Sequence, residues 1–339
     1  MPRLTVSAVV PTYNRASLLE KALRTALAEC EPGDEIIVVD DGSTDGTEAV
    51  VRGFGPAVRY LRSEHVGAGA ARNIGIAAAT CDLVAFLDSD DEWVRGKLSW
   101  QRAVFEHFPE ILFVFSDFGR IARTGDRLHG GLLAGKDSQS GAWDTILGDG
   151  LSSATIPGLP ASAPPFGLHI GRLYEMYIHR WCVFTSTVVV RRVDAGDALR
   201  FAEDVPTYED LECYARLAGR GLAGFMDCET AWQRKHAGPR LTDADRAMSA
   251  DTAVKIIDRV WGVDDDYLRS HRDEFETVMD GHRGSKVRYL LRSSRRQEAR
   301  QELGRFFHAP LSYYALTYLP SSLMRFAVAV RGRLQPSSR

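Results

Sequence analysis

The sequence predicts an α/β fold, in which a mainly parallel, Rossmann-like sheet is flanked by helices and followed by a helical C-terminal extension. Three observations support this prediction. Between residues 4 and 115, short aliphatic runs alternate with segments of helical periodicity, a succession typical of parallel sheets. Three of these runs end in polar clusters, as expected where ligands bind at the carboxyl ends of strands. From about residue 243 onward the strand pattern stops and helical segments follow one another.

The strands and helices of the first part can be assigned in order. Aliphatic runs predict buried strands at residues 4–10, 35–40, 58–61, 83–87 and 111–115. Helical spacing predicts helices at residues 16–28, 45–54, 68–79 and 97–108. Further strands are expected at 186–191, 222–226 and 230–234, with a helix at 208–217. Between these parts, residues 136–167 are rich in Gly, Ser, Ala and Pro, which indicates either a functional loop or disorder.

Composition and charge limit the classes of protein that the chain can represent. Its five cysteines are scattered and form no Cys-x-x-Cys pair, so we expect neither a disulfide framework nor a zinc site, in keeping with a cytoplasmic protein. The sequence has no run of about 18 apolar residues, so no transmembrane helix is expected. Residues 282–339 carry 12 Lys or Arg against 2 Asp or Glu. Such a basic region favours an anionic partner, either a membrane or a nucleic acid.

The sharpest motif is Asp88-Ser89-Asp90-Asp91, which directly follows a buried strand. Neighbouring carboxylates repel one another, and a divalent cation relieves that repulsion. Hard oxygen ligands suit Mg²⁺ or Mn²⁺, which proteins usually share with the phosphates of a substrate. The alternative is a solvated acidic turn in which Asp91 caps the next helix. The preceding buried strand favours the metal site.

Two further polar clusters end strands of the same sheet, Pro11-Thr12-Tyr13-Asn14-Arg15 and Asp40-Asp41-Gly42-Ser43-Thr44-Asp45. We expect them to meet the acidic turn at one edge. The second cluster resembles a calcium loop, but Arg52 stands where a bidentate Glu is required. Residues 67–72 begin like a dinucleotide-binding fingerprint, but Arg72 replaces its last glycine. Arg72 is either a contact for a diphosphate or an ordinary exposed helix residue.

Two later segments supply candidate chemistry. Glu209-Asp210 stands at a predicted helix start, where a carboxylate is either a general base or an acid favoured by the helix dipole. Arg234 and His236 follow a predicted strand. Arg234 is a candidate phosphate contact and His236 a candidate metal ligand, although a single histidine is more often structural.

Taken together, these motifs resemble glycosyltransferase family 2, of the GT-A fold and of the non-processive bacterial type. The likeness is dense over residues 1–120 and sparser over 180–240. It implies an inverting, metal-dependent enzyme that moves a sugar from a nucleotide-diphosphate donor, with UDP favoured, to an acceptor hydroxyl. By this resemblance Asp210 is the catalytic base, and Asp90 and His236 bind Mn²⁺ or Mg²⁺. The residues implied in binding the donor nucleotide and diphosphate are Pro11, Thr12, Tyr13, Asp41, Arg72, Asp88, Ser89 and Arg234.

The sequence departs from the family pattern at two places. Tyr208 stands where the family often has Gly before Glu-Asp, which predicts a narrower acceptor site. The Gln-x-x-Arg-Trp motif of processive synthases is absent, since Trp232 precedes Gln233. We therefore expect an enzyme that adds one sugar at a time. Two alternatives remain open, a catalytically inactive nucleotide-sugar-binding module and a sugar nucleotidyltransferase, although the latter would be expected to have a Gly-rich, Lys-containing loop after its first strand.

The resemblance also gives the domain organisation and the partners. Residues 1–240 are expected to form the GT-A catalytic domain, with a nucleotide-sugar-binding half at 1–120 and an acceptor-binding half at 120–240. Residues 241–339 are expected to form a basic helical extension. This extension either docks peripherally on the inner face of an anionic membrane or packs on the core or on a second subunit, as in a homo-oligomer. The acceptor is a glycan, a lipid-linked sugar or a small molecule, and no nucleic-acid partner is expected.

Overall fold

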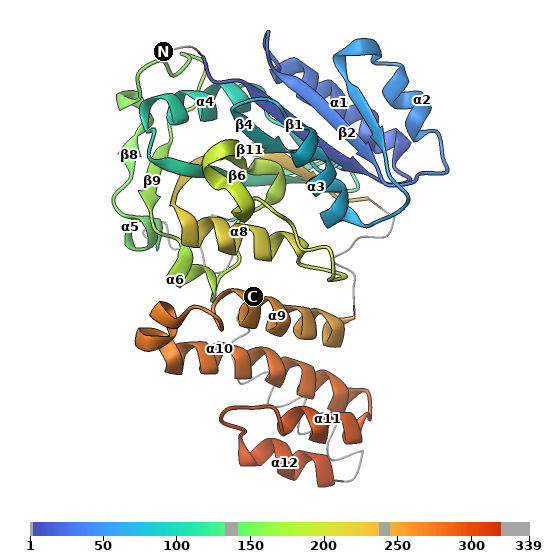
Figure 1. Ribbon diagram of the computed structural model, residues 1–339, viewed down its shortest axis with the longest axis vertical. Helices are drawn as coiled ribbons and strands as arrows, with labels where there is room; N and C mark the ends of the chain where they lie inside the picture. The colour runs from blue at the N-terminus through green and yellow to red at the C-terminus, as the bar shows by residue number, and fades with distance from the viewer. Residues whose placement is uncertain (1–2, 133–141, 237–244, 320–339) are drawn as a thin grey trace. The chain divides into compact units, whose positions relative to one another are not determined.

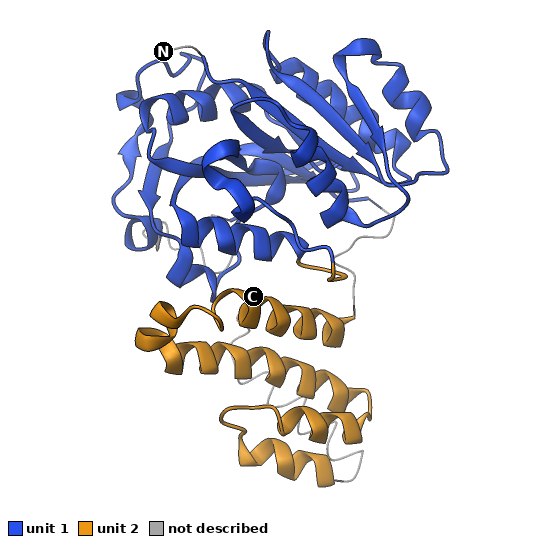
Figure 2. Cartoon of the chain, viewed as in Figure 1, with its two compact units in different colours: residues 1–203, 209–238 blue, residues 204–208, 239–339 orange. Residues whose placement is uncertain are grey.

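The computed structural model describes residues 3–132, 142–236 and 245–319. The chain divides into two compact units, shown in different colours in Figure 2. Unit 1 comprises residues 1–203 and 209–238, and unit 2 comprises residues 204–208 and 239–339. Each unit is described by itself below.

Unit 1 is built on a sheet whose first half is parallel. The strands β1 (Val6–Thr12), β2 (Glu35–Asp40), β3 (Arg59–Arg62) and β4 (Leu83–Phe86) lie in the order β3-β2-β1-β4 (Figure 1). The central strand β1 is buried along its whole length, which explains why its sequence is mostly apolar and does not alternate apolar with exposed polar residues. This half of the sheet confirms the predicted α/β fold.

The second half of the sheet is mixed. The strand β10 (Val189–Arg191) runs antiparallel between β4 and β6 (Ile111–Ile121), so β6 has the same direction as β4. The long strand β11 (Leu222–Arg234) is parallel to β6. It also pairs with β9 (Gly167–Gly171) and β5 (Asp91–Trp93). The short strands β7 (Arg127–Leu128) and β8 (Leu151–Ser152) pair with β6 and β9.

The helices of unit 1 bury apolar side chains against this sheet. They are α1 (Ala16–Glu29), α2 (Thr47–Arg52), α3 (Ala68–Ala78), α4 (Lys97–His107), α5 (Ala142–Leu147), α6 (Tyr174–Tyr177), α7 (Arg192–Ala195) and α8 (Glu209–Arg220). The helix α3 lies closest to β1, because a side chain at Gly75 would come within 2.3 Å of Val9 Cγ1. Glycine at this position lets α3 approach the sheet and sets the place of Arg72 on the same helix.

Three predicted elements differ from the structure. The strands expected at 222–226 and 230–234 are one strand, β11, with irregular register between Met226 and Ala231. The bulges interrupt the side-chain alternation from which a continuous strand is predicted. The strand expected at 186–191 begins only at Val189, because Thr185–Thr187 form a 3₁₀ turn. In the segment 136–167, the described residues from 142 onward contain α5 and β8 rather than one long loop.

Unit 2 is helical throughout its described residues beyond 245. Its helices are α9 (Arg246–Val260), α10 (Asp265–Arg292), α11 (Arg296–Leu303) and α12 (Leu311–Tyr318). Two aspartates cap helix N-termini, since Asp245 accepts from the amide of Ala247 and Asp264 from that of Tyr267. Asp204 binds Lys255 and Arg259 of α9. Within residues 3–132, 142–236 and 245–319, no helix has the length and apolarity needed to cross a membrane.

Candidate active site

The topology brings the predicted site segments to one edge of the sheet. Because β1, β2, β4, β6 and β11 share one direction, their carboxyl ends lie at the same edge. Thr12 and Asp40 end β1 and β2, Asp88 follows β4, and Arg234 ends β11. The first and last of these positions, Thr12 and Arg234, are 222 residues apart in the sequence, so the fold assembles the edge from distant segments.

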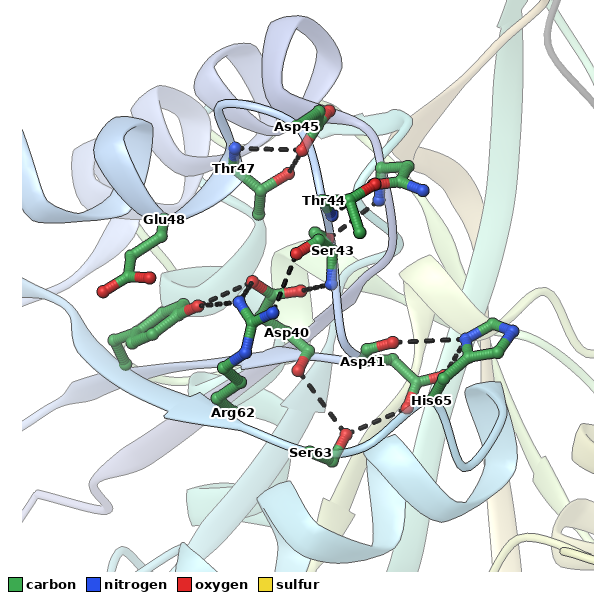
Figure 3. A network of polar contacts seen from close by, with 12 residues as sticks. Asp40, Asp41, Ser43, Thr44, Asp45, Thr47, Glu48, Arg62, Ser63 and His65 are labelled. Atoms are coloured by element: carbon green, nitrogen blue, oxygen red, sulfur yellow. Dashed lines mark hydrogen bonds and ion pairs between the residues drawn. The ribbon is translucent and has the colours of Figure 1, made fainter.

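A network around Asp40 and Asp41 shapes one side of this edge (Figure 3). The carboxylate of Asp41 accepts hydrogen bonds from Ser63 Oγ at 2.9 Å and from the amides of Val66 and Gly67 at 2.6 and 2.9 Å. Asp41 is buried, and its own amide donates to Thr12 O at 2.8 Å. The Asp41 side chain therefore holds the loop of residues 63–67 against the ends of β1 and β2.

The same network fixes the loops that follow β1 and β2. Asn14 joins them, because its amide donates to Ser43 Oγ at 2.8 Å and its Oδ1 accepts from the Thr44 amide at 2.8 Å. The two carboxylate oxygens of Asp45 accept from the amides of Thr47 and Ala16, which begin α2 and α1. Asp45 thus caps both helices, and the calcium-like spacing of this loop has a structural explanation.

An aromatic pair lies beside Asp41. The rings of Tyr13 and His65 stack with centroids 4.1 Å apart, and Tyr13 is 41% exposed. His65 is held by Asp41, whose backbone oxygen lies 3.2 Å from His65 Nδ1 (Figure 3). His65 was not among the predicted site residues, because nothing in its sequence neighbourhood distinguishes it from an ordinary loop histidine. Exposed stacked rings are suited to contact the flat face of a base.

The acidic turn places Asp90 between two nitrogen-bearing side chains. Asp90 Oδ1 lies 2.7 Å from Arg15 Nη1, and Asp90 Oδ2 lies 2.8 Å from His236 Nε2. The structure therefore brings together Asp90 and His236, the two residues predicted as metal ligands. Arg15, which precedes α1, belongs to the cluster expected to meet the acidic turn, but no role was predicted for its side chain.

Asp91 has a different environment from that of a solvated helix cap. It begins β5 and is buried, with Oδ2 accepting from Ser186 Oγ at 2.6 Å. Burial, followed by repulsion from Asp90 and Asp88, raises the pKa of Asp91 well above its usual value. Three carboxyl groups crowd this turn, which is unfavourable unless one of them is protonated or cations balance the charge.

Arg72 supplies part of that balance. It is buried, and its two terminal nitrogens bind Asp88 Oδ1 at 2.6 Å and Glu209 Oε1 at 2.8 Å. Its guanidinium also lies over the ring of Phe201, 5.1 Å from the centroid. Arg72 is thus not an exposed helix residue, and it joins the acidic turn to the start of α8.

Asp210 stands next to Glu209 at the start of α8. Its Oδ2 accepts a hydrogen bond from Thr185 Oγ1 at 3.1 Å. Burial raises the pKa of Asp210 to about 6, and the charges of Glu209 and Asp88 add to the rise while Arg72 opposes it. A carboxylate with such a pKa is ionised at neutral pH and still basic enough to accept a proton.

The remaining predicted residues take supporting positions. Pro11, Thr12 and Ser89 are buried, so they shape the edge rather than offer exposed side chains. Arg234 Nε donates to Glu92 Oε1 at 3.1 Å. Tyr208 has a φ of 60°, in the left-handed region that favours glycine. A glycine, which the family named in the sequence analysis often has before Glu-Asp, would adopt this backbone conformation without strain.

The donor set fits a divalent cation. Asp90 and His236 offer an oxygen and a nitrogen within 2.8 Å of each other, and Asp88 stands on the same turn. Mg²⁺ and Mn²⁺ are bound through one or two carboxylates together with phosphate oxygens. Among the residues that the structure describes, no group of three or more His, Cys, Asp or Glu side chains is placed to hold a metal ion.

We expect the Arg72 bridge to be a major source of stability. Arg72→Met removes the shared cation from the buried Glu209 and the partly exposed Asp88, and it is expected to lower the free energy of unfolding by about 3 kcal/mol, the low end of the cost of breaking a buried pair. Arg52 pairs with Glu48 on the exposed face of α2, so Arg52→Met is the matched control, with a cost below about 1 kcal/mol. Urea denaturation measures both. Equal costs for the two variants would contradict the buried-bridge assignment.

The parallel sheet with an acidic turn at its carboxyl edge has the arrangement of the GT-A fold. Comparison with known proteins gives a family match for the first part of unit 1, since residues 7–133 match the model of glycosyl transferase family 2.

The curated relatives that match part of the chain are glycosyltransferases by name. The chain is 36% identical over 128 residues to the putative teichuronic acid biosynthesis glycosyltransferase TuaG of Bacillus subtilis, which covers 36% of this chain and 50% of TuaG. It is 38% identical over 104 residues to the GalNAc(5)-diNAcBac-PP-undecaprenol beta-1,3-glucosyltransferase of Campylobacter jejuni, covering 29% and 33%. An uncharacterized glycosyltransferase of Rickettsia conorii is 30% identical over 135 residues, covering 38% and 22%. The matched region thus spans half or less of each of these relatives.

Solved structures share the fold over nearly the whole chain. TarS of Staphylococcus aureus (residues 1–349, in complex with UDP-GlcNAc) superposes with a TM-score of 0.56 at 16% identity, covering 96% of this chain and 89% of that chain. The mannosyltransferase PcManGT of Pyrobaculum calidifontis, in complex with GDP-Man and Mn²⁺, gives a TM-score of 0.57 at 18% identity, covering 99% and 82%. At these identities the likeness establishes the fold.

Proposed function

We propose that this protein transfers a sugar from a nucleotide-diphosphate donor to an acceptor hydroxyl, with inversion at the anomeric carbon and with Asp210 as the base. One observation carries the proposal. Arg72 links Asp88 of the acidic turn to Glu209, the neighbour of Asp210, so a donor-binding turn and a proton acceptor belong to one connected site. An inverting transfer needs this pair, because the acceptor is deprotonated on the face opposite to the leaving diphosphate.

The donor is proposed to lie along the carboxyl edge of β1, β2 and β4. Tyr13 and His65 offer a stacking surface for the base, and Asp41 holds the loop that carries His65. Asp90 and His236 would hold Mn²⁺ or Mg²⁺, with Asp88 beside them. A cation bound there would supply positive charge against the diphosphate leaving group. Two arginines are proposed to add positive charge at the same edge. They are Arg15, between β1 and α1, and Arg234, the last residue of β11.

The proposed role of Asp210 follows from its environment. Its pKa of about 6 leaves the carboxylate ionised at neutral pH, ready to take the proton of an acceptor hydroxyl as that oxygen attacks the sugar. Thr185 Oγ1 donates to one carboxylate oxygen, which leaves the other oxygen to receive the proton. The reaction then needs no separate acid, because a diphosphate leaves as an anion.

UDP is the favoured nucleotide. TarS binds UDP-GlcNAc and PcManGT binds GDP-Man with Mn²⁺, so the shared fold serves both uracil and guanine nucleotides. We favour UDP on the resemblance of Asp41 to the family residue that accepts from a uracil ring. The acceptor is proposed to be a glycan or a lipid-linked sugar, in keeping with the names of TuaG and the Campylobacter enzyme.

A panel of UDP-, GDP- and dTDP-sugars, each with Mn²⁺ and with a chelator, tests the donor assignment by thermal shift. A ligand that binds only the folded protein stabilises it by about 2.7 kcal/mol at a hundredfold excess over Kd. We expect stabilisation with UDP-sugars that is lost with the chelator. A shift with GDP-sugars alone would correct the nucleotide, and no shift with any donor would contradict the proposed function.

A further inference from the structure

The turn Thr185–Thr187 lies between the acidic turn and Asp210 and contacts both. Thr185 Oγ1 donates to Asp210 Oδ2 at 3.1 Å. The next residue, Ser186, faces the other way, since its Oγ donates to Asp91 Oδ2 at 2.6 Å and accepts from the Asp88 amide at 3.1 Å. Two adjacent hydroxyls thus reach the two sides of the proposed site.

Buried side chains donate hydrogen bonds to the backbone oxygens of this turn. Trp93 Nε1 donates to Ser186 O at 2.9 Å. Lys97 Nζ and Gln101 Nε2 both donate to Thr187 O, at 3.0 and 2.8 Å. Thr185, Ser186, Thr187, Lys97 and Gln101 are all buried. Such a fully hydrogen-bonded interior network is rigid, so the turn has little freedom to move its two hydroxyls.

We propose that the Thr185–Thr187 turn is a positioning element, in which Thr185 sets the place of the proton-accepting carboxylate and Ser186 sets the place of the acidic turn. The inference rests on the proposed function and extends it to residues that contact neither donor nor acceptor. Its basis is that one rigid segment of three residues makes hydrogen bonds both to Asp210 and to the acidic turn. The distance between the base and the donor-binding turn is then fixed by the fold before any substrate binds.

The two hydroxyls are expected to have different kinetic signatures. A hydrogen bond donated to a carboxylate favours its charged form, so the Thr185 hydroxyl makes Asp210 less basic and holds one of its oxygens still. Ser186 acts on Asp88 and Asp91, so its loss is expected to weaken donor binding. The other charged or titratable groups that interact with Asp210 are Arg72, Asp88, Glu209, Cys213, Tyr214 and Tyr177. Of these groups, Tyr214 also interacts with the Thr185 side chain, so Tyr214→Phe is measured alongside to separate its contribution.

The experiment measures kcat/KM against pH for Thr185→Val, with Thr185→Ser as the conservative variant. Loss of one such hydrogen bond is expected to move the acidic limb upward by about one pH unit. The variant would then be about twofold slower than the wild type at pH 7, about fivefold slower at pH 6 and nearly equal above pH 8. Thr185→Ser is expected to keep the wild-type limb. If Thr185→Val does not fold, Thr185→Ala serves in its place.

A matched control and a second readout separate this inference from its premise. The Thr187 hydroxyl donates to Phe184 O rather than to a carboxylate, so Thr187→Val should change stability without moving the acidic limb. Ser186→Ala is expected to weaken donor binding in the presence of Mn²⁺, raising the apparent Kd about tenfold. Thermal shift measures this affinity and requires no turnover. The inference would be overturned if the acidic limb of the pH profile stayed in place in Thr185→Val. It would also be overturned if that limb moved equally in Thr187→Val. Failure of the proposed function is distinct, since the wild type would then neither bind a donor nor turn over.

Discussion

Asp210→Asn is expected to reduce sugar transfer by about 10²–10⁴-fold while donor binding stays at the wild-type level. Asparagine keeps the shape of the side chain and the contact with Thr185, but it cannot accept the acceptor proton. Transfer is measured as release of the nucleoside diphosphate, and donor affinity by thermal shift. Glu212, two residues further along α8, pairs with Arg216, so Glu212→Gln is the matched control and should retain most of the activity.

The wild-type pH profile and the stability of the same variant give independent checks. Activity should fall about tenfold per pH unit below the Asp210 pKa of about 6. Because folding raises this pKa above its ordinary value of 3.8, the cost of the ionised carboxylate to the folded state grows as the pH rises from about 4 to about 6 and is fully present above pH 6. Asp210→Asn should therefore have a higher Tm than the wild type at pH 8, and the difference should disappear as the pH falls towards 4. An active Asp210→Asn enzyme would falsify the base assignment.

Asp90→Ala is expected to abolish the stabilisation that Mn²⁺ and donor give together. The substitution removes the carboxylate that lies between Arg15 and His236. Loss of a residue that only supports a metal ligand already costs about 10–100-fold in metal affinity, so loss of a proposed ligand is expected to cost far more than tenfold. Asp90→Asn tests whether charge or shape is decisive. Donor titrations with increasing Mn²⁺ give the apparent affinity of each protein.

The control for Asp90 lies at the opposite end of the same strand. Asp82, just before β4, accepts from the amide and the hydroxyl of Thr5, far from the carboxyl edge. Asp82→Asn should lower stability and leave the Mn²⁺ dependence of donor binding unchanged. If Asp90→Ala and Asp82→Asn lost the Mn²⁺-dependent shift equally, the loss would reflect general destabilisation, and the metal-ligand assignment of Asp90 would be wrong.

The parallel half of the sheet was predictable because each of its elements has a local signal. The run from Ile36 to Val39 and the alanine-rich periodicity of 68–79 are readable within single windows, and the structure has β2 and α3 there. The second half was not, because strand pairing is a relation between distant segments. The sequence of Val189–Arg191 does not indicate that this segment pairs antiparallel with both β4 and β6.

The candidate site was predictable to a similar extent. Asp88 and Asp90 follow a buried strand, so their position at the edge is a local inference. The partners of Arg72 were hidden, because Glu209 lies 137 residues further along the chain. Ser186 and Thr187 were predicted as the start of a strand, since the β-branched residues that follow favour extended structure. They belong instead to the turn Thr185–Thr187, whose conformation is fixed by buried hydrogen bonds from Lys97 and Gln101.

The antiparallel strand β10 also has a consequence for how the chain folds. The strands β1 to β4 are complete once residue 86 has been synthesised, but the free side of β4 is covered only when β10 arrives about a hundred residues later. During that interval an apolar strand has an unpaired edge, which is the feature through which nascent sheets associate with other chains. Folding of unit 1 is therefore slowed by one long-range pairing, and a chaperone that shields the β4 edge would act at this step.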